Sequence, residues 1–134
     1  MDEFEAIEEI VSTLGKSPVA SHVQLGPGDD AAITSSPTGF DTVSSIDTLS
    51  EGVHFPLGSD PKLIGYRSFM VSVSDLAAMG ADPSHAMVAL TLPDDPEIEW
   101  IKRLSEGFKE AADSCEMPVV GGNLTYGKQF SISV

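Results

Sequence analysis

The stretch 85–92, HAMVALTL, constrains the fold more than any other part of the chain. Both faces that a strand would present here are apolar, because Met87 and Ala89 alternate with Val88 and Leu90. Such a pattern is typical of a central strand that is covered on each side. A proline follows at once and ends the run. The chain must therefore bury a sheet and pack other elements over this strand.

Three segments have the 3.6-residue apolar spacing of amphipathic helices. They predict helices over residues 3–14, 61–79 and about 98–115. Asp60-Pro61 marks the start of the second helix, because Asp caps exposed amides and proline is tolerated at the first helical position.

Short strands are expected between and after these helices. They are predicted at residues 31–33, 42–49, 85–92, 119–120 and 130–134. The order predicts an α+β fold, with a mixed or antiparallel sheet of about four or more strands and helices on one face. A chain of 134 residues has room for one core, so we expect residues 1–134 to form a single domain.

The chain is strongly acidic. It carries 7 Lys and Arg against 21 Asp and Glu, a formal net charge of −14. No run of basic residues is present, so nucleic acid is not an expected partner. A phosphorylated ligand would need its charge offset by divalent cations held on carboxylates. The alternative is that the acidity only solvates the surface.

The location and redox chemistry are also limited by the sequence. No apolar stretch approaches the ~20 residues that span a bilayer, so no membrane partner is expected. The acidic start, MDEFEAIEEI, lacks the features of a secretory signal, which predicts a cytoplasmic protein. A single cysteine, Cys115, excludes an internal disulfide or a cysteine zinc cluster.

Acidic side chains occupy places where neighbours, strand propensity or burial disfavour them. Asp29 and Asp30 follow two glycines on a tight turn, where adjacent carboxylates repel each other. Asp47 lies inside an apolar strand, and Asp75 lies in the otherwise apolar second helix. Each acid alone could be a cap or a surface residue. Together, with Ser45 as a further oxygen ligand or phosphate donor, they predict a hard-cation site, and oxygen ligands favour Mg²⁺.

Two further features have both a functional and a structural interpretation. Gly121-Gly122 follows a short buried strand and would let backbone amides approach a phosphate, although a plain hairpin turn also explains the pair. His54 would contact a substrate phosphate or simply pack. Neither a P-loop nor a Rossmann glycine motif is present, so ATP would have to bind by another route.

Four segments resemble thiamine-monophosphate kinase. They are GPGDDAA at 26–32, SIDTLSEGVHF at 45–55, DPKLIGYRSFMVSVSDLAAMGADP at 60–83 and VVGGN at 119–123. That family belongs to a superfamily with aminoimidazole ribonucleotide synthetase, selenophosphate synthetase and a hydrogenase maturation protein. The resemblance covers nearly the whole chain and is to the amino-terminal domain of the kinase.

The resemblance implies transfer of the γ-phosphoryl group of ATP to thiamine monophosphate, which gives thiamine diphosphate and ADP. Several Mg²⁺ ions would bridge the nucleotide phosphates to carboxylates, which by position are Asp30, Asp47 and Asp75. Asn123 stands where the family often has Asp and would offer its carbonyl oxygen to the metal with one charge fewer. Ile46 replaces a hydroxyl residue and would contribute only its backbone carbonyl.

The resemblance also assigns the remaining site positions. Ser45, Gly121 and Gly122 correspond to positions near the nucleotide phosphates, and His54 corresponds to a substrate contact. No side chain is expected to act as nucleophile or base, because this chemistry needs positioning and charge neutralisation.

Assembly and completeness follow from the same resemblance. It implies a homodimer in which the sheets of two subunits pair into a barrel. Because the last predicted strand runs to the end of the chain, we expect a truncated protein without its carboxy-terminal domain, with weak nucleotide binding and no turnover. The competing interpretations are a sister enzyme of the superfamily, and a metal-binding dimerisation module without activity.

Overall fold

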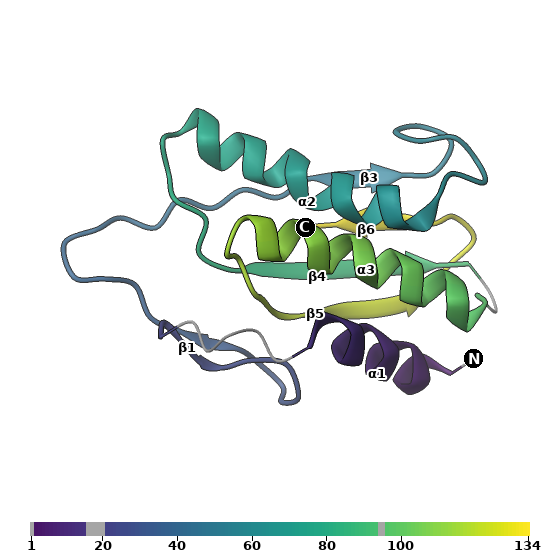
Figure 1. Ribbon diagram of the computed structural model, residues 1–134, viewed down its shortest axis with the longest axis horizontal. Coiled ribbons are helices and arrows are strands. Elements are labelled where there is room, and N and C mark those ends of the chain that lie inside the picture. Colours follow the sequence, from purple (N-terminus) through teal and green to yellow (C-terminus); the bar gives the residue numbers. More distant parts are fainter. Residues whose placement is uncertain (1, 16–20, 94–95) are drawn as a thin grey trace.

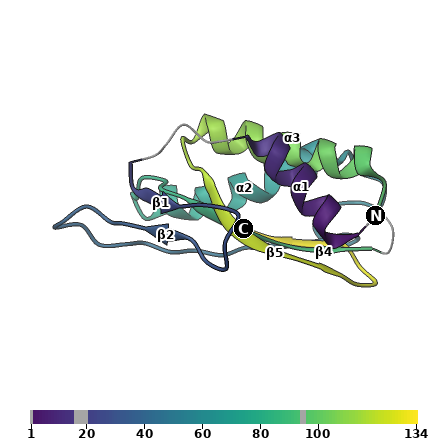
Figure 2. The ribbon, with the colours of Figure 1, turned by 90° about the horizontal axis from the view of Figure 1, so that it is seen from below.

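The computed structural model describes residues 2–15, 21–93 and 96–134. Within these residues, three helices cover one face of a four-stranded sheet, and a two-stranded sheet lies apart from it (Figure 1 and Figure 2). The helices are α1 (Glu3–Leu14), α2 (Pro61–Ala78) and α3 (Ile98–Ser114). The strands are β1 (Val23–Leu25), β2 (Ile33–Thr34), β3 (Thr48–Ser50), β4 (Ala86–Leu92), β5 (Val119–Tyr126) and β6 (Ser131–Ser133). The predicted α+β class and mixed sheet are confirmed.

The larger sheet has the strand order β3-β6-β4-β5. Strand β6 is antiparallel to both β3 and β4, whereas β4 and β5 are parallel. A parallel pair needs a crossover connection, and α3 provides it. None of the helices in the described part of the chain is long and apolar enough to cross a membrane.

Paired residues form rows across the four strands, and the middle row is buried beneath the helices. It consists of Leu49, Ile132, Leu90 and Leu124, none more than 5% exposed. Because neighbouring positions along a strand face opposite sides, the rows on either side lie on the other face of the sheet. We call this surface the open face. Its two rows are Thr48, Ser133, Ala89 and Asn123, and Ser50, Ser131, Thr91 and Thr125.

Strand β4 corrects one sequence prediction. Ala86, Val88 and other alternate residues are buried under the helices, but Met87 is 57% exposed and Ala89 is also exposed. The chain therefore covers this central strand on one side, not on both. The physical reason is that all three helices lie on the same face of the sheet (Figure 2).

The predicted strand at 42–49 is also shorter than expected, because β3 begins only at Thr48. Residues 35–47 run as an extended connection between the two sheets (Figure 1). Alternating side chains gave these residues a strand pattern, but a strand also needs a neighbour to bond with. Within this segment, Asp47 makes the ladder-like pair, with Val134.

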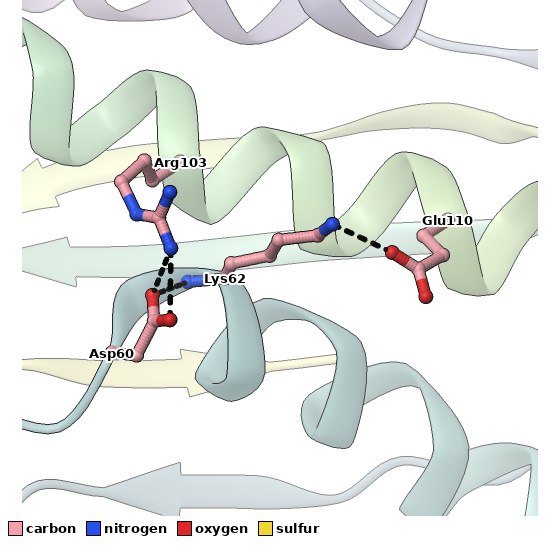
Figure 3. A network of polar contacts seen from close by, with 4 residues as sticks. All are labelled: Asp60, Lys62, Arg103 and Glu110. Atoms are coloured by element: carbon pink, nitrogen blue, oxygen red, sulfur yellow. Dashed lines mark hydrogen bonds and ion pairs between the residues drawn. The ribbon is translucent and has the colours of Figure 1, made fainter.

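The start of α2 agrees with the sequence prediction. The side chain of Asp60 accepts a hydrogen bond from the Lys62 amide at 3.0 Å, and Pro61 is the first helical residue. Figure 3 shows how α3 joins this cap: Arg103 donates to both carboxylate oxygens of Asp60, and Lys62 pairs with Glu110 at 2.9 Å. The hydrogen bond from Arg103 holds the pKa of Asp60 below its ordinary value.

Helices α2 and α3 touch through two glycines. A Cβ atom on Gly65 would overlap the carbonyl oxygen of Leu104, and one on Gly107 would overlap the carbonyl oxygen of Lys62. Only hydrogen fits between the two backbones at these points. The contact fixes the position of α2 over β3 and β6, which matters because α2 carries much of the candidate site.

Candidate functional site

Asp75 and Ser45 are brought together by the fold. The hydroxyl of Ser45 donates to a carboxylate oxygen of Asp75 at 2.8 Å, although the two residues lie 30 positions apart. Asp75 lies in the last turn of α2, where no basic residue is present. A carboxylate is disfavoured there because the carboxyl end of a helix is the negative end of its dipole. A bound cation would relieve that repulsion.

Asp47 is tied to the same end of α2 through the main chain of Val134. Asp47 and Val134 exchange two backbone hydrogen bonds of 3.1 Å. The buried hydroxyl of Ser72 donates to the same Val134 main-chain oxygen at 2.7 Å. Ser72 precedes Asp75 by three residues, so both lie on one side of the helix. The backbone of the half-buried Asp47 is therefore held, through Val134, at the end of α2 that carries Asp75.

Ser72 is a residue that the sequence reasoning missed. A serine inside the apolar run VSVSD of α2 was the available signal, because a hydroxyl at a core-facing helix position needs a partner. In the structure, that partner is a neighbouring strand end and not the helix's own backbone.

Asp30 does not join these residues. It lies exposed in the loop between β1 and β2, and its own amide bonds to the side chain of Asp29 at 2.8 Å. Figure 1 shows β1 beyond the β5 edge of the larger sheet, whereas α2 lies over β3 and β6. In the described ranges, no three or more His, Cys, Asp or Glu side chains are grouped so as to hold a metal ion. The expected convergence of Asp30 with Asp47 and Asp75 is thus not seen.

The glycine pair and Asn123 lie inside β5, so the alternative of a hairpin turn is wrong. Gly122 pairs with Val88, and a Cβ on Gly122 would overlap the Val88 carbonyl oxygen. The contact between β4 and β5 therefore explains this glycine by itself. Gly121 has no such restriction, since the nearest atom to its Cβ position is a Met87 side-chain carbon at 3.8 Å. Asn123 is exposed on the open face.

His54 lies in a tight turn after β3. The amide of Ser50 donates to its Nδ1 at 2.9 Å, so Nδ1 has no proton and Nε2 carries it. The guanidinium of Arg67 donates to the His54 carbonyl oxygen at 2.8 Å. The next residue, Phe55, is buried against the ring of Phe130, with 5.6 Å between ring centroids. The turn is thereby fixed while the His54 ring stays exposed.

The oxygen donors present fit Mg²⁺ better than a metal that needs a closed protein cage. Asp47, Asp75 and Ser45 offer two carboxylates and a hydroxyl. Mg²⁺ keeps several waters and is commonly held by one or two carboxylates together with substrate phosphates. A group of three preformed acidic ligands is therefore not required for a nucleotide-bound ion.

Comparison with known proteins gives a consistent result. Residues 28–134 match the family described as AIR synthase related protein, N-terminal domain. Thiamine-monophosphate kinase of Bacillus subtilis is 38% identical over 124 residues, which are 92% of this chain and 37% of that protein. The chain spans about a third of the length of the curated relatives that it matches.

Solved structures show the same similarity. Thiamine-monophosphate kinase from Stenotrophomonas maltophilia K279a superposes with a TM-score of 0.79 at 35% identity, covering 99% of this chain and 41% of that one. AaThiL complexed with AMPPCP and TMP gives a TM-score of 0.65 at 37% identity, covering 66% and 29%. These similarities confirm the resemblance to thiamine-monophosphate kinase.

Proposed function

Because the chain belongs to the family of AIR synthase related proteins, N-terminal domain, we propose that it is the nucleotide- and metal-binding domain of a thiamine-monophosphate kinase. The observation that carries this proposal is the 35% identical kinase structure that matches 99% of the chain. The reaction is transfer of the γ-phosphoryl group of ATP to thiamine monophosphate. AaThiL in complex with AMPPCP, an ATP analogue, and TMP supports both substrates.

Asp47, Asp75 and Ser45 form the part of the site that faces the nucleotide phosphates. Bound Mg²⁺ would neutralise phosphate charge there. The chain's own contribution is to hold two carboxylates in fixed places: Ser45 orients Asp75 by hydrogen bonding, and Val134 fixes the backbone of Asp47. Phosphoryl transfer gains mainly from such positioning, which needs no protein nucleophile.

The role of the other predicted positions remains part of the proposal. Asp30 and Asn123 are further metal ligands, Gly121 and Gly122 lie near the phosphates, and His54 contacts the acceptor. Asp30 lies in the loop of a separate two-stranded sheet, so the β1–β2 loop has to move toward α2 for it to take part. Of the two glycines, Gly121 has room at its Cβ position, whereas that position in Gly122 is filled by the Val88 carbonyl oxygen.

A homodimer with paired sheets is the assembly that best suits the open face. Its two rows across the sheet hold eight residues without a single charge, in a chain where 21% of residues are charged. A hydroxyl contact between Thr48 and Ser133, at 2.7 Å, already links two of its strands. Strand β5 is also a long edge, with β4 on one side. A second copy would cover both the face and the edge.

The metal site is tested by titrating AMPPCP calorimetrically, with and without Mg²⁺. We expect Mg²⁺-dependent binding that weakens roughly tenfold or more in Asp47→Asn and in Asp75→Asn, because each change removes a charged ligand. Asp41→Asn is the matched control, since Asp41 is an exposed acid outside the site. Equal affinity in all three variants, or affinity that ignores Mg²⁺, contradicts the assignment.

A further inference from the structure

The turn that carries His54 is fixed by several hydrogen bonds to other parts of the chain. Glu51 donates its amide to the Phe130 carbonyl oxygen at 3.0 Å and accepts at its own carbonyl from Gln129 at 2.7 Å. Gly52 bonds to Phe55 at 2.8 Å, and Arg67 anchors the His54 carbonyl oxygen. These contacts leave the imidazole edge with Nε2–H as a fixed, exposed donor.

The turn packs against a cluster of three aromatic side chains, which adds rigidity. Phe130 is buried between Phe55 and Trp100, with ring centroids 5.6 Å and 4.9 Å away. Aromatic pairs in tilted and edge-on arrangements are favourable beyond their buried area. A donor mounted on such a support loses little conformational entropy when it binds a ligand.

Arg67 differs from the other arginine in the chain. Arg103 pairs with Asp60, and the lysines Lys62 and Lys109 each pair with an acidic residue. Arg67 has no carboxylate partner within the described part of the chain; its contact is with the His54 carbonyl oxygen through one Nη atom. In a chain with 21 acidic residues, an exposed guanidinium that keeps unused donors and is held at the turn carrying the His54 imidazole is a group suited to an external anion.

We propose that Arg67 and the Nε2–H of His54 form an oxyanion subsite that binds the phosphate of the acceptor, a phosphomonoester. This inference rests on the proposed kinase function and adds Arg67 to it as a substrate-binding residue. A planar guanidinium and a neighbouring N–H suit a tetrahedral phosphate, which accepts several hydrogen bonds at once.

The acceptor phosphate, and not the nucleotide, is assigned to this subsite because of its place along α2. Arg67 precedes Asp75 by eight residues, a rise of about 12 Å along the helix. The two residues therefore lie at separate places on the helix, with the Asp75 carboxylate in its last turn and the Arg67 cation nearer the middle, and the γ-phosphate would lie between them, within reach of the acceptor phosphate. Metal ions held by the carboxylates would neutralise the nucleotide, whereas Arg67 would supply the positive charge that the acceptor's phosphate needs in an acidic protein.

The test compares thiamine monophosphate, inorganic phosphate and Mg²⁺–AMPPCP as probes, by calorimetry and by amide NMR shifts at residues 50–55. The variants are Arg67→Gln, Arg67→Lys and Lys102→Gln, all in the full chain. Lys102 is an exposed lysine on α3, so its loss removes one charge elsewhere. Arg67→Lys keeps the charge and a donor for the His54 carbonyl, so it separates the loss of the charge from loosening of the turn.

We expect both phosphate probes to shift the amides of the turn in the wild type. Arg67→Gln should weaken thiamine monophosphate binding roughly tenfold or more, with partial recovery in Arg67→Lys and no change in Lys102→Gln. Unchanged binding in Arg67→Gln, equal loss in Lys102→Gln, or no phosphate binding by the wild type overturns the subsite. Failure of the kinase proposal is read separately, as absence of Mg²⁺–AMPPCP binding in every variant, and a fall of that binding in Arg67→Gln would reassign Arg67 to the nucleotide.

Discussion

Replacing Gly107 by alanine tests whether α2 and α3 meet as closely as the structure shows. Besides overlapping the Lys62 carbonyl oxygen, the new Cβ would lie 2.8 Å from the Tyr66 amide nitrogen, well inside the 3.4 Å at which ordinary contact begins. The obstacle is backbone, which cannot rotate away as a side chain can. The helices must therefore separate by about 0.6 Å to clear the Tyr66 amide, and by more to clear the Lys62 carbonyl oxygen.

The cost follows from the side chains that the two helices bury against each other. Ile64, Phe69, Leu104 and Phe108 are each at most 5% exposed, and their burial is worth ~2 kcal/mol apiece. A gap of about half an ångström to one ångström forfeits a quarter to a half of the contact energy, or ~2–4 kcal/mol. The higher helix propensity of alanine relative to glycine offsets ~1 kcal/mol of this loss. We expect a net loss of ~2 kcal/mol, within the range for overpacked cores.

The measurement is urea unfolding followed by far-UV circular dichroism, at several protein concentrations so that any oligomer is accounted for. For a chain of this size the loss corresponds to a fall in Tm of about 8 °C. Gly26→Ala is the control, because its Cβ would meet a single carbon at 4.0 Å. A Gly107→Ala protein that is as stable as the wild type, or more stable by its helix propensity, would refute the close helix contact.

Two further predictions concern single residues. Ser72→Ala should lower stability by ~1 kcal/mol in the same urea assay and weaken Mg²⁺–AMPPCP binding, because it removes the hydroxyl that ties α2 to Val134. The control, Ser105→Ala, removes a hydroxyl bonded within its own helix and should leave nucleotide binding unchanged. Equal effects of the two substitutions on nucleotide binding would contradict this role of Ser72. Burial, with a smaller effect of neighbouring His22, lowers the pKa of His85 in the folded chain below 6.5. As the pH falls, the unfolded chain therefore takes up this proton before the folded chain does. The contribution of His85 to stability is complete above pH 6.5 and is lost as the pH falls through the lowered folded pKa. Thermal unfolding between pH 5 and 8 should show a smaller pH dependence in His85→Gln than in the wild type, and identical profiles would rule out this contribution.

Local rules predicted the helices well because each is set by its own sequence. The helix at 3–14 and the start at Asp60-Pro61 were both correct, since apolar spacing and end caps act within a few residues. The third helix was placed within one residue of its end. Propensity and long-range packing point to the same structure in these segments.

The strands were harder to predict because their partners lie far away in sequence. Residues 42–47 alternate like a strand, yet no neighbour pairs with them as a ladder apart from the Asp47–Val134 contact. The predictions for β4 and for the glycine pair in β5 were wrong for the same reason, because both depend on contacts with distant parts of the chain. Met87 is apolar although the chain leaves it exposed, and Gly122 is required by contact with Val88 and not by a turn. Neither fact is encoded in the local pattern.

In the candidate site, too, the sequence predicted the suitable residue types but not which of them lie together. Ser45 and Asp75 were chosen for their residue type, and the fold joins them over 30 positions. The chemistry of Asp30 is as suitable for a metal, but its loop belongs to a separate sheet. Residue type therefore identifies which side chains suit a cation, whereas sheet topology decides which of them meet.

In the proposed site, helix α2 connects ligand binding to stability. Its Arg67, Ser72 and Asp75 contact three different segments, the His54 turn, the end of β6 and the extended connection before β3. Each contact places one part of the site, so their spacing is set by a single rigid element. The position of that element depends in turn on two glycines, one in α2 and one in α3, that allow backbone contact. A substitution at Gly65 or Gly107 would therefore displace all three contacts together, although neither glycine is part of the proposed site.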